Sequence, residues 1–145
     1  MKKSTTLVFS ALMTISTAVF ADQELESMSK ADVQKALVNQ TGTSIPTVRL
    51  NNQAVTNTFK FYMDDQGHIF GKFLHKPKGQ PKIDQGTYNI DSDGKLHITW
   101  QHWDNAQAIC FYLYNTQNDY LSIGCDNSFH TAFVKASMRA GNQLK

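Results

Sequence analysis

Residues 108–125 decide the fold of this chain, and they read AICFYLYNTQNDYLSIGC. Two stretches rich in aromatic and aliphatic residues flank Asn115–Asp119, whose composition is typical of a turn. If the chain reverses there so that facing residue numbers sum to 235, Tyr112 lies opposite Ile123 and Tyr114 opposite Leu121. Successive side chains of a strand point to opposite faces. The stretch therefore predicts a β-hairpin with the tyrosines on one face.

The same register places Cys110 opposite Cys125, and these are the two cysteines of the chain. Facing cysteines at a non-hydrogen-bonded pair have Cα atoms about 4.5 Å apart, which is within disulfide reach. Two cysteines without further ligands make a poor zinc site. We therefore predict a Cys110–Cys125 disulfide, which would contribute roughly 3 kcal/mol by closing a loop of about 15 residues.

Short strands separated by turn residues extend outward from this hairpin. Connections this short favour antiparallel pairing, because a parallel crossover needs about a dozen residues or more. The turns Asp64–Gly67 and Asp91–Gly94 resemble each other, and aspartates in such turns usually bond nearby backbone amides. Strands are predicted at Thr47–Leu50, Thr56–Met63, His68–Leu74, Gly86–Asp91, Lys95–Trp100, Ala108–Asn115, Tyr120–Cys125 and Phe129–Ala136.

The predicted fold class is mainly β: an antiparallel meander forming a lipocalin-like small barrel or a sandwich, with one N-terminal helix packed on it. The helix is predicted over residues 29–40, with Ser29 as N-cap, Asp32 three residues later and Gly42 as the residue that ends it. The segment Lys76–Asp84, which contains two prolines, is predicted to be a loop.

The N-terminal 21 residues are typical of a secretory signal peptide. Lys2 and Lys3 precede the apolar stretch Leu7–Phe20, and Val19-Phe20-Ala21 suits a signal peptidase. The apolar stretch is too short for a membrane span of about 20 residues. We expect a mature single domain over residues 22–145 without a transmembrane segment, located in the periplasm or secreted, where disulfides persist.

Charge and motifs argue against several function classes. Without Lys2 and Lys3 the chain has twelve basic and twelve acidic residues, so it lacks the basic footprint of a nucleic-acid binder. No catalytic motif and no cofactor motif is present, so no catalytic residue and no cofactor is predicted. His97 and His102, five apart on a strand, point to opposite faces, so no metal site is predicted.

The aromatic residues are the richest candidates for binding. Leu96, Ile98 and Trp100 alternate toward one face, so Trp100 is expected in the core. Trp103 follows the end of that strand and is expected to be solvent-accessible. A ligand site is therefore predicted at Trp103, His102, Tyr112 and Tyr114, as small barrels bind at one end. The alternative is that most of these aromatic residues build the core.

The segments Gly67–Phe73, Gly86–Ile90, Asp93–Trp100 and Cys110 share a pattern of turn and core residues. In these segments the chain resembles an uncharacterised family of small exported bacterial β domains. The family pattern is a Gly-x-aromatic strand, a turn ending in Gly-Lys-Leu, a strand with a Trp and a later Cys, and the match covers about residues 50–142. This resemblance implies a sheet-rich exported domain and no activity. The family usually has a Cys where this chain has His97, which leaves a different disulfide open. The chain is also similar to small substrates of type II secretion.

These observations favour an exported, non-catalytic binding protein whose partner is a protein, a glycan or a lipid. Two alternatives remain open. One is an inhibitor of a hydrolase such as lysozyme, because small disulfide-bonded barrels include such inhibitors. The other is a secreted hydrolase with an unrecognised site, in which substitution of His102 or Asp104 would abolish turnover. The sequence predicts no oligomeric state.

Overall fold

The computed structural model of the protein describes residues 25–46, 58–127 and 130–145. The predicted signal peptide, residues 1–21, lies outside the described residues, as does the predicted strand Thr47–Leu50. Within the described ranges, no helix is both long enough and apolar enough to cross a membrane.

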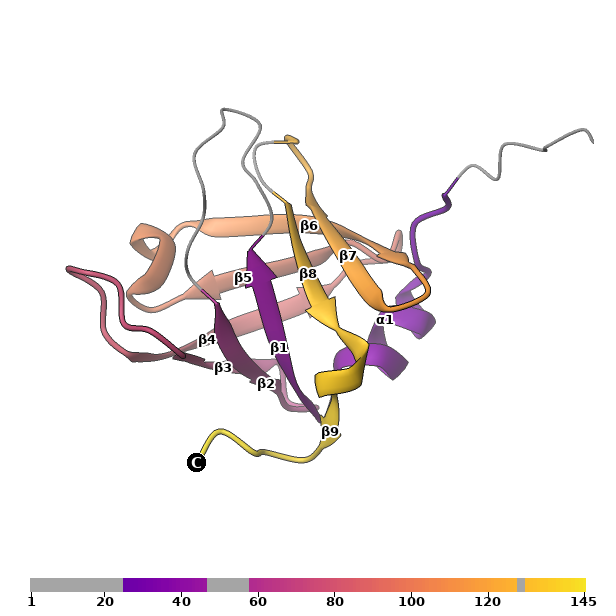
Figure 1. Ribbon diagram of the computed structural model, residues 1–145. Helices are drawn as coiled ribbons and strands as arrows, with labels where there is room; N and C mark the ends of the chain where they lie inside the picture. Colours follow the sequence, from indigo (N-terminus) through magenta and orange to yellow (C-terminus); the bar gives the residue numbers. More distant parts are fainter. Residues whose placement is uncertain (1–24, 47–57, 128–129) are drawn as a thin grey trace, which may run out of the picture.

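Eight antiparallel strands form a closed barrel (Figure 1). Each strand pairs with the next along the chain, and β1 closes the barrel by pairing with both β2 and β8. The predicted antiparallel meander is therefore confirmed, and it is a barrel rather than a sandwich. The strands are β1 Gln40–Pro46, β2 Phe59–Met63, β3 His68–Phe73, β4 Ile83–Ile90, β5 Leu96–Trp100, β6 Ala108–Asn115, β7 Asp119–Gly124 and β8 His130–Val134.

Three short elements complete the described part of the chain and were not predicted. The 3-10 helix η1, Trp103–Ala106, connects β5 to β6. The 3-10 helix η2, Lys135–Ser137, follows β8 and leads to β9, Arg139–Ala140. Strand β9 pairs with Gln40 and Thr41 of β1, next to the β1 residues that pair with β8.

The helix α1, Lys30–Leu37, begins as the sequence predicts. The Ser29 side chain accepts a hydrogen bond from the backbone N–H of Asp32, and Val33 and Leu37 are fully buried. The predicted helix end was wrong. Asn39, with φ 57°, takes the left-handed conformation after the helix, and Gly42 lies within β1, where a Cβ would press on Phe61.

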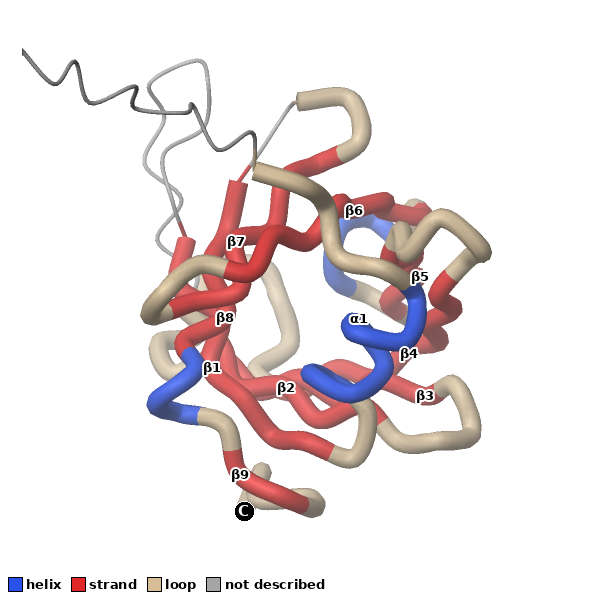
Figure 2. Tube along the Cα trace, turned by 90° about the vertical axis from the view of Figure 1, so that its right-hand side faces the viewer, coloured by secondary structure: helices blue, strands red, loops and turns tan. Residues whose placement is uncertain are grey.

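The two ends of the barrel differ. Helix α1 lies across the end formed by the short turns (Figure 2). At this end Asp64 accepts hydrogen bonds from the N–H groups of Gln66 and His68. Asp91 accepts the equivalent two bonds in the β4–β5 turn, which confirms the predicted repetition of turn chemistry. The segment 74–82 and η1 lie at the opposite end, called the loop end below (Figure 1).

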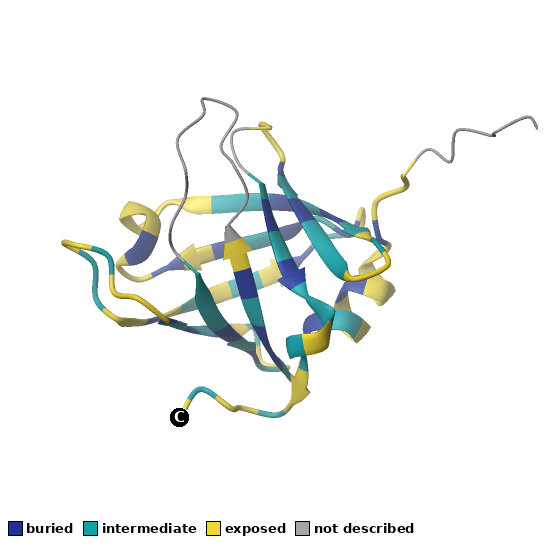
Figure 3. Cartoon of the chain, viewed as in Figure 1, coloured by how far each residue is buried: buried dark blue, intermediate teal, exposed yellow. Residues whose placement is uncertain are grey.

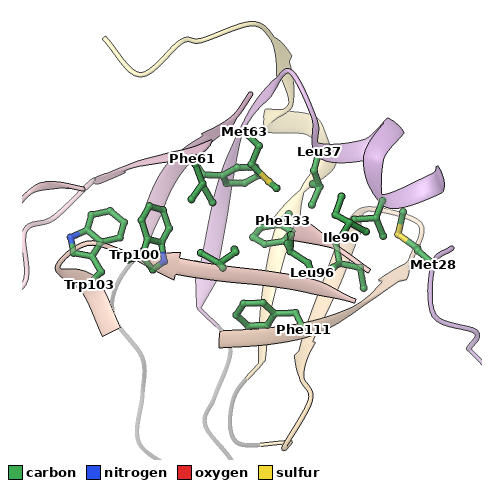
Figure 4. Close-up of a cluster of buried hydrophobic side chains, with 14 of the residues drawn as sticks. Met28, Leu37, Phe61, Met63, Ile90, Leu96, Trp100, Trp103, Phe111 and Phe133 are labelled. Carbon is green, nitrogen blue, oxygen red and sulfur yellow. The ribbon is translucent and has the colours of Figure 1, made fainter. Parts of the chain in front are cut away.

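Buried residues recur along α1 and the strands (Figure 3), and their apolar side chains fill the barrel interior (Figure 4). Phe61, Leu96, Leu113, Phe111 and Phe133 belong to this core and are all buried. Burying one such side chain contributes roughly 1.5–3 kcal/mol to folding. The barrel is thus a packed core and not an open cup along the described strands.

The hairpin of β6 and β7 has the predicted register. Tyr112 faces Ile123 and Tyr114 faces Leu121. The predicted disulfide joins Cys110 to Cys125, with Cα atoms 5.4 Å apart. The expected pair type was wrong. Because the Cys125 N–H donates to the Cys110 carbonyl, the cysteines form a hydrogen-bonded pair, whose Cα atoms are typically about 5.5 Å apart.

Candidate functional site

Trp103 does not form the accessible aromatic site that its position after β5 suggested. It is 3% exposed, as buried as Trp100 at 2%. Its ring centroid lies 4.0 Å from that of Phe73 and 4.6 Å from that of Trp100, and its indole N–H donates to the Pro81 carbonyl at 2.9 Å. The strand does end near Gln101, as predicted, but η1 then turns the ring back into the loop end of the barrel (Figure 4).

The carboxylate of Asp84 holds this turn in place. Asp84 lies in β4 with its side chain 1% exposed, and one oxygen accepts hydrogen bonds from the backbone N–H groups of His102 and Trp103, both at 2.8 Å. The other oxygen lies 2.9 Å from Nδ1 of His102. A buried carboxylate is tolerated only when it is bonded in this way.

The electrostatics of Asp84 reflect these bonds. Burial alone disfavours the charged form, but the hydrogen bonds from the His102 side chain and from the Trp103 and His102 amides outweigh it, and the pKa of Asp84 is lowered from its ordinary value. The carboxylate is therefore ionised at neutral pH and accepts the Nδ1 proton of His102. With Nδ1 bound to Asp84, Nε2 is the other ring nitrogen of His102.

The turn after Trp103 has an unusual backbone. Asp104, Asn105 and Ala106 have φ angles of 54°, 57° and 56°, so three consecutive non-glycine residues are left-handed. This conformation costs energy at each residue, most clearly at Ala106, which has no polar side chain to offset it. Asp84 and the buried ring of Trp103 supply the interactions that maintain it.

The chemistry available at Asp84 and His102 is limited. An aspartate that orients an exposed imidazole is the base-and-orienter part of a hydrolytic triad. His102 is 66% exposed, so its Nε2 could take a proton from a bound molecule. Among the described residues, however, no serine, threonine or cysteine side chain bonds to His102.

Two further Asp–His pairs show that this arrangement recurs as a structural device. Asp64 binds His68 Nδ1 at 2.9 Å, and Asp91 binds His97 Nε2 at 3.0 Å. His97 and His102 thus bind different aspartates. In the part of the chain that the structure describes, no group of three His, Cys, Asp or Glu side chains is arranged to hold a metal ion.

The predicted tyrosines lie away from Trp103. Tyr112 and Tyr114 are on the outer face of β6, half-buried, whereas Phe111 and Leu113 point into the core. The ammonium of Lys95 lies 5.4 Å from the centre of the Tyr112 ring, and Tyr114 pairs with Ser27 at the short-turn end. The structure brings Trp103 and His102 together, but it does not bring the four predicted ligand-binding residues into one site.

A groove of about 550 Å³ lies elsewhere, on the outer face of β3, β4 and β5. We call it the outer groove. Sequence reasoning did not single out these residues. The available signal was Phe70, an aromatic residue at an outward position of β3 between inward Ile69 and Gly71. The side chains that line it are His68, Phe70, Gln85, Thr87, Thr99 and Gln101.

A second groove, of about 560 Å³, lies between α1 and the β6–β7 turn. Its most prominent cation, Lys135, already binds Asn115 Oδ1 and the Thr116 carbonyl and lies 4.9 Å from the centre of the Tyr120 ring. These contacts tie η2 to the β6–β7 turn.

Comparison of the chain with protein-family models, with curated proteins and with solved structures finds no match.

Proposed function

We propose that this protein is an exported binding protein without catalytic activity, and that it binds its ligand in the outer groove. The observation that carries the proposal is the groove itself. It combines a half-buried aromatic ring, Phe70, with exposed amide and hydroxyl groups, whereas the barrel interior is packed with side chains. Ligand sites usually combine apolar surface with a few polar groups that fix orientation.

The proposed location is the periplasm or the external medium. The signal-like N-terminus and the resemblance to exported β domains support export. The Cys110–Cys125 disulfide is compatible with it, since such bonds persist in oxidising compartments.

A thermal-shift screen tests the proposal. The purified protein is screened with neutral sugars, nucleotides, amino acids, phospholipid headgroups and short peptides, because a ligand that binds only the folded state raises Tm. At least one class should raise Tm for the unmodified protein and for Asn89→Arg, an exposed position on the same face of β4 outside the groove lining. Thr99→Arg, which fills the groove, should abolish the shift. No shift with any class, or a shift that survives Thr99→Arg, would contradict the proposal.

A hydrolase is the second candidate, favoured by the Asp84–His102 pair. Its imidazole would act as the general base that activates water. Ester, glycoside and peptide substrates should then be turned over, and His102→Gln should abolish turnover while leaving the free energy of unfolding nearly unchanged, because the backbone N–H groups still bind Asp84. Turnover that persists in His102→Gln would exclude this role.

A further inference from the structure

A row of four side chains crosses adjacent strands; three of them line the outer groove, and the fourth, Tyr62, lies beside it. Tyr62 in β2 faces Phe70 in β3, and Phe70 faces Gln85 in β4. Gln101, just after β5, donates its backbone N–H to the Gln85 carbonyl, so it continues the row. Four strands at a spacing of about 4.8 Å make this row roughly 14 Å long.

The two halves of the row differ in chemistry. The rings of Tyr62 and Phe70 lie next to each other at an interplanar angle of 23°, with centroids 6.2 Å apart, and form the aromatic half of the row. Gln85 and Gln101 are exposed, and the Gln85 amide donates to the Gln101 amide oxygen at 3.4 Å. This bond leaves the Gln85 oxygen and the Gln101 NH₂ group available, one as an acceptor and one as a donor.

A second row runs beside the first and adds hydroxyl groups. Thr87 faces His68 on one side and Thr99 on the other, and all three are exposed. Neither threonine hydroxyl has a hydrogen-bond partner among residues 25–46, 58–127 and 130–145. Each hydroxyl can therefore donate to and accept from a bound molecule.

The charge of the groove lining indicates whether its ligand is neutral or ionic. None of the side chains that line the groove is Lys, Arg, Asp or Glu. The nearest cations on this face, Lys60 and Lys72, face each other in the adjacent row, and the Lys72 ammonium binds the Leu144 carbonyl. A groove of amides, hydroxyls and aromatic rings suits a neutral molecule better than an anion.

The closed barrel also argues against two other classes of ligand, extended peptides and lipids. Strands β3, β4 and β5 each pair on both sides, so their backbone groups are not available for an extended peptide to add as a strand. Among the outward-pointing side chains that line the groove, Phe70 is the apolar one, and Tyr62 lies next to it, which is little for a lipid chain. A sugar has an apolar C–H face for an aromatic ring and hydroxyls at its edges for amide and hydroxyl groups.

We propose that the outer groove binds a neutral oligosaccharide, with one sugar ring against Phe70 and Tyr62 and the next over Gln85, Gln101, Thr87 and Thr99. This inference rests on the proposed function and specifies its ligand class. The row is longer than a single sugar, so affinity should rise from the monosaccharide to the trisaccharide.

Isothermal titration calorimetry tests the inference with four series of neutral oligosaccharides: cello-, xylo-, malto- and N-acetylchito-oligosaccharides. At least one series should bind, and Phe70→Ala should weaken its binding by about tenfold or more through loss of the aromatic contact. The double variant Gln85→Ala/Gln101→Ala, which leaves the rings in place, should weaken it comparably. Asn89→Ala should bind like the unmodified protein, because Asn89 lies on the same face but does not line the groove.

All substituted side chains point away from the core, so each variant should fold. Its disulfide and its thermal unfolding profile are measured as the control. Binding of a neutral series that is lost in both groove variants and kept in Asn89→Ala supports the inference. Suppose that no neutral series binds, but another ligand class raises Tm and this shift is lost in Thr99→Arg. The oligosaccharide inference then fails and the proposed function stands. If no class binds, both fail.

Discussion

The six-membered ring of Trp103 occupies the space that a side chain at position 71 would need. A Cβ built on Gly71 would overlap this ring and would also lie 2.8 Å from the ring of Trp100. Gly71 faces Asp84 across the β3–β4 pair, and the Asp84 carboxylate binds the backbone N–H of Trp103. One strand thus provides the space for the indole, and the next provides the acceptor that orients it.

The first prediction concerns the stability that Trp103 provides. Trp103→Ala should lower the free energy of unfolding by about 3–5 kcal/mol, as Trp100→Ala should, because each leaves a large cavity in the core. Urea denaturation followed by circular dichroism measures both. Ile83→Ala, at a position 63% exposed, is the control and should be close to neutral.

The same burial predicts the fluorescence of the native protein. Both indoles should resist acrylamide quenching, because neither ring is accessible. If about half of the emission were quenched as strongly as that of free tryptophan, one indole would be accessible, which would contradict the buried position of Trp103. A Trp103→Ala variant as stable as Ile83→Ala would contradict it as well.

The second prediction separates the charge of Asp84 from its hydrogen bonds. Asp84→Ala should destabilise the protein by about 1–3 kcal/mol, because the N–H groups of His102 and Trp103 lose their acceptor. Asp84→Asn keeps an acceptor oxygen and removes the charge, so it should cost less. Denaturation at neutral pH compares the two variants, and equal losses would show that the charge and not the acceptor geometry matters.

The pH dependence follows from the lowered pKa of Asp84. A folded-state pKa below the ordinary value of 3.8 contributes stability above that value, and this contribution is lost as the pH falls through the folded pKa. The stability difference between the unmodified protein and Asp84→Asn should therefore be largest near neutral pH and shrink below about pH 4. A constant difference from pH 7 to pH 2 would contradict this assignment.

The β6–β7 hairpin could be predicted from the sequence down to single residue pairs, because its register depends on a short turn and on local alternation. The burial of Trp103 could not be predicted from the sequence. It depends on Asp84 and on the space over Gly71, which lie 19 and 32 positions earlier in the chain. Local pattern places a residue after a strand end, but only the packing of distant strands decides whether it points out or in.

Strand β1 was missed for a related reason. Thr41, Gly42 and Ser44 are buried, and this polar, small-residue segment lacks the apolar alternation that identifies a half-buried strand. Ser44 is buried because its hydroxyl bonds to the Thr131 hydroxyl in β8, a partner 87 residues away. The outer groove was missed because its polar residues look like any solvated face of a sheet, and only Phe70 stands out among them.

The third prediction concerns the disulfide. Intact-mass analysis of the oxidised protein should give two hydrogens fewer than the reduced chain. The double variant Cys110→Ser/Cys125→Ser should lose roughly 3 kcal/mol of stability in the chain-entropy account of a loop of about 15 residues. It should keep the barrel, since the disulfide lies on the outer face of a hairpin that β5 and β8 also pair with. Two free thiols without reductant would contradict the bond.

The last prediction uses two glycines with the same backbone conformation and different surroundings. Gly94 and Gly79 have φ angles of 80° and 81°, so alanine at either position carries a left-handed penalty of roughly 1–2 kcal/mol. A Cβ at Gly79 would meet nothing within 4 Å, whereas a Cβ at Gly94 would overlap the carbonyl oxygen of Met28, just before α1. Gly94→Ala should therefore cost about 1–3 kcal/mol more than Gly79→Ala, because it displaces the entry to the helix. Urea denaturation measures both, and equal losses would show that Met28 does not pack against the β4–β5 turn.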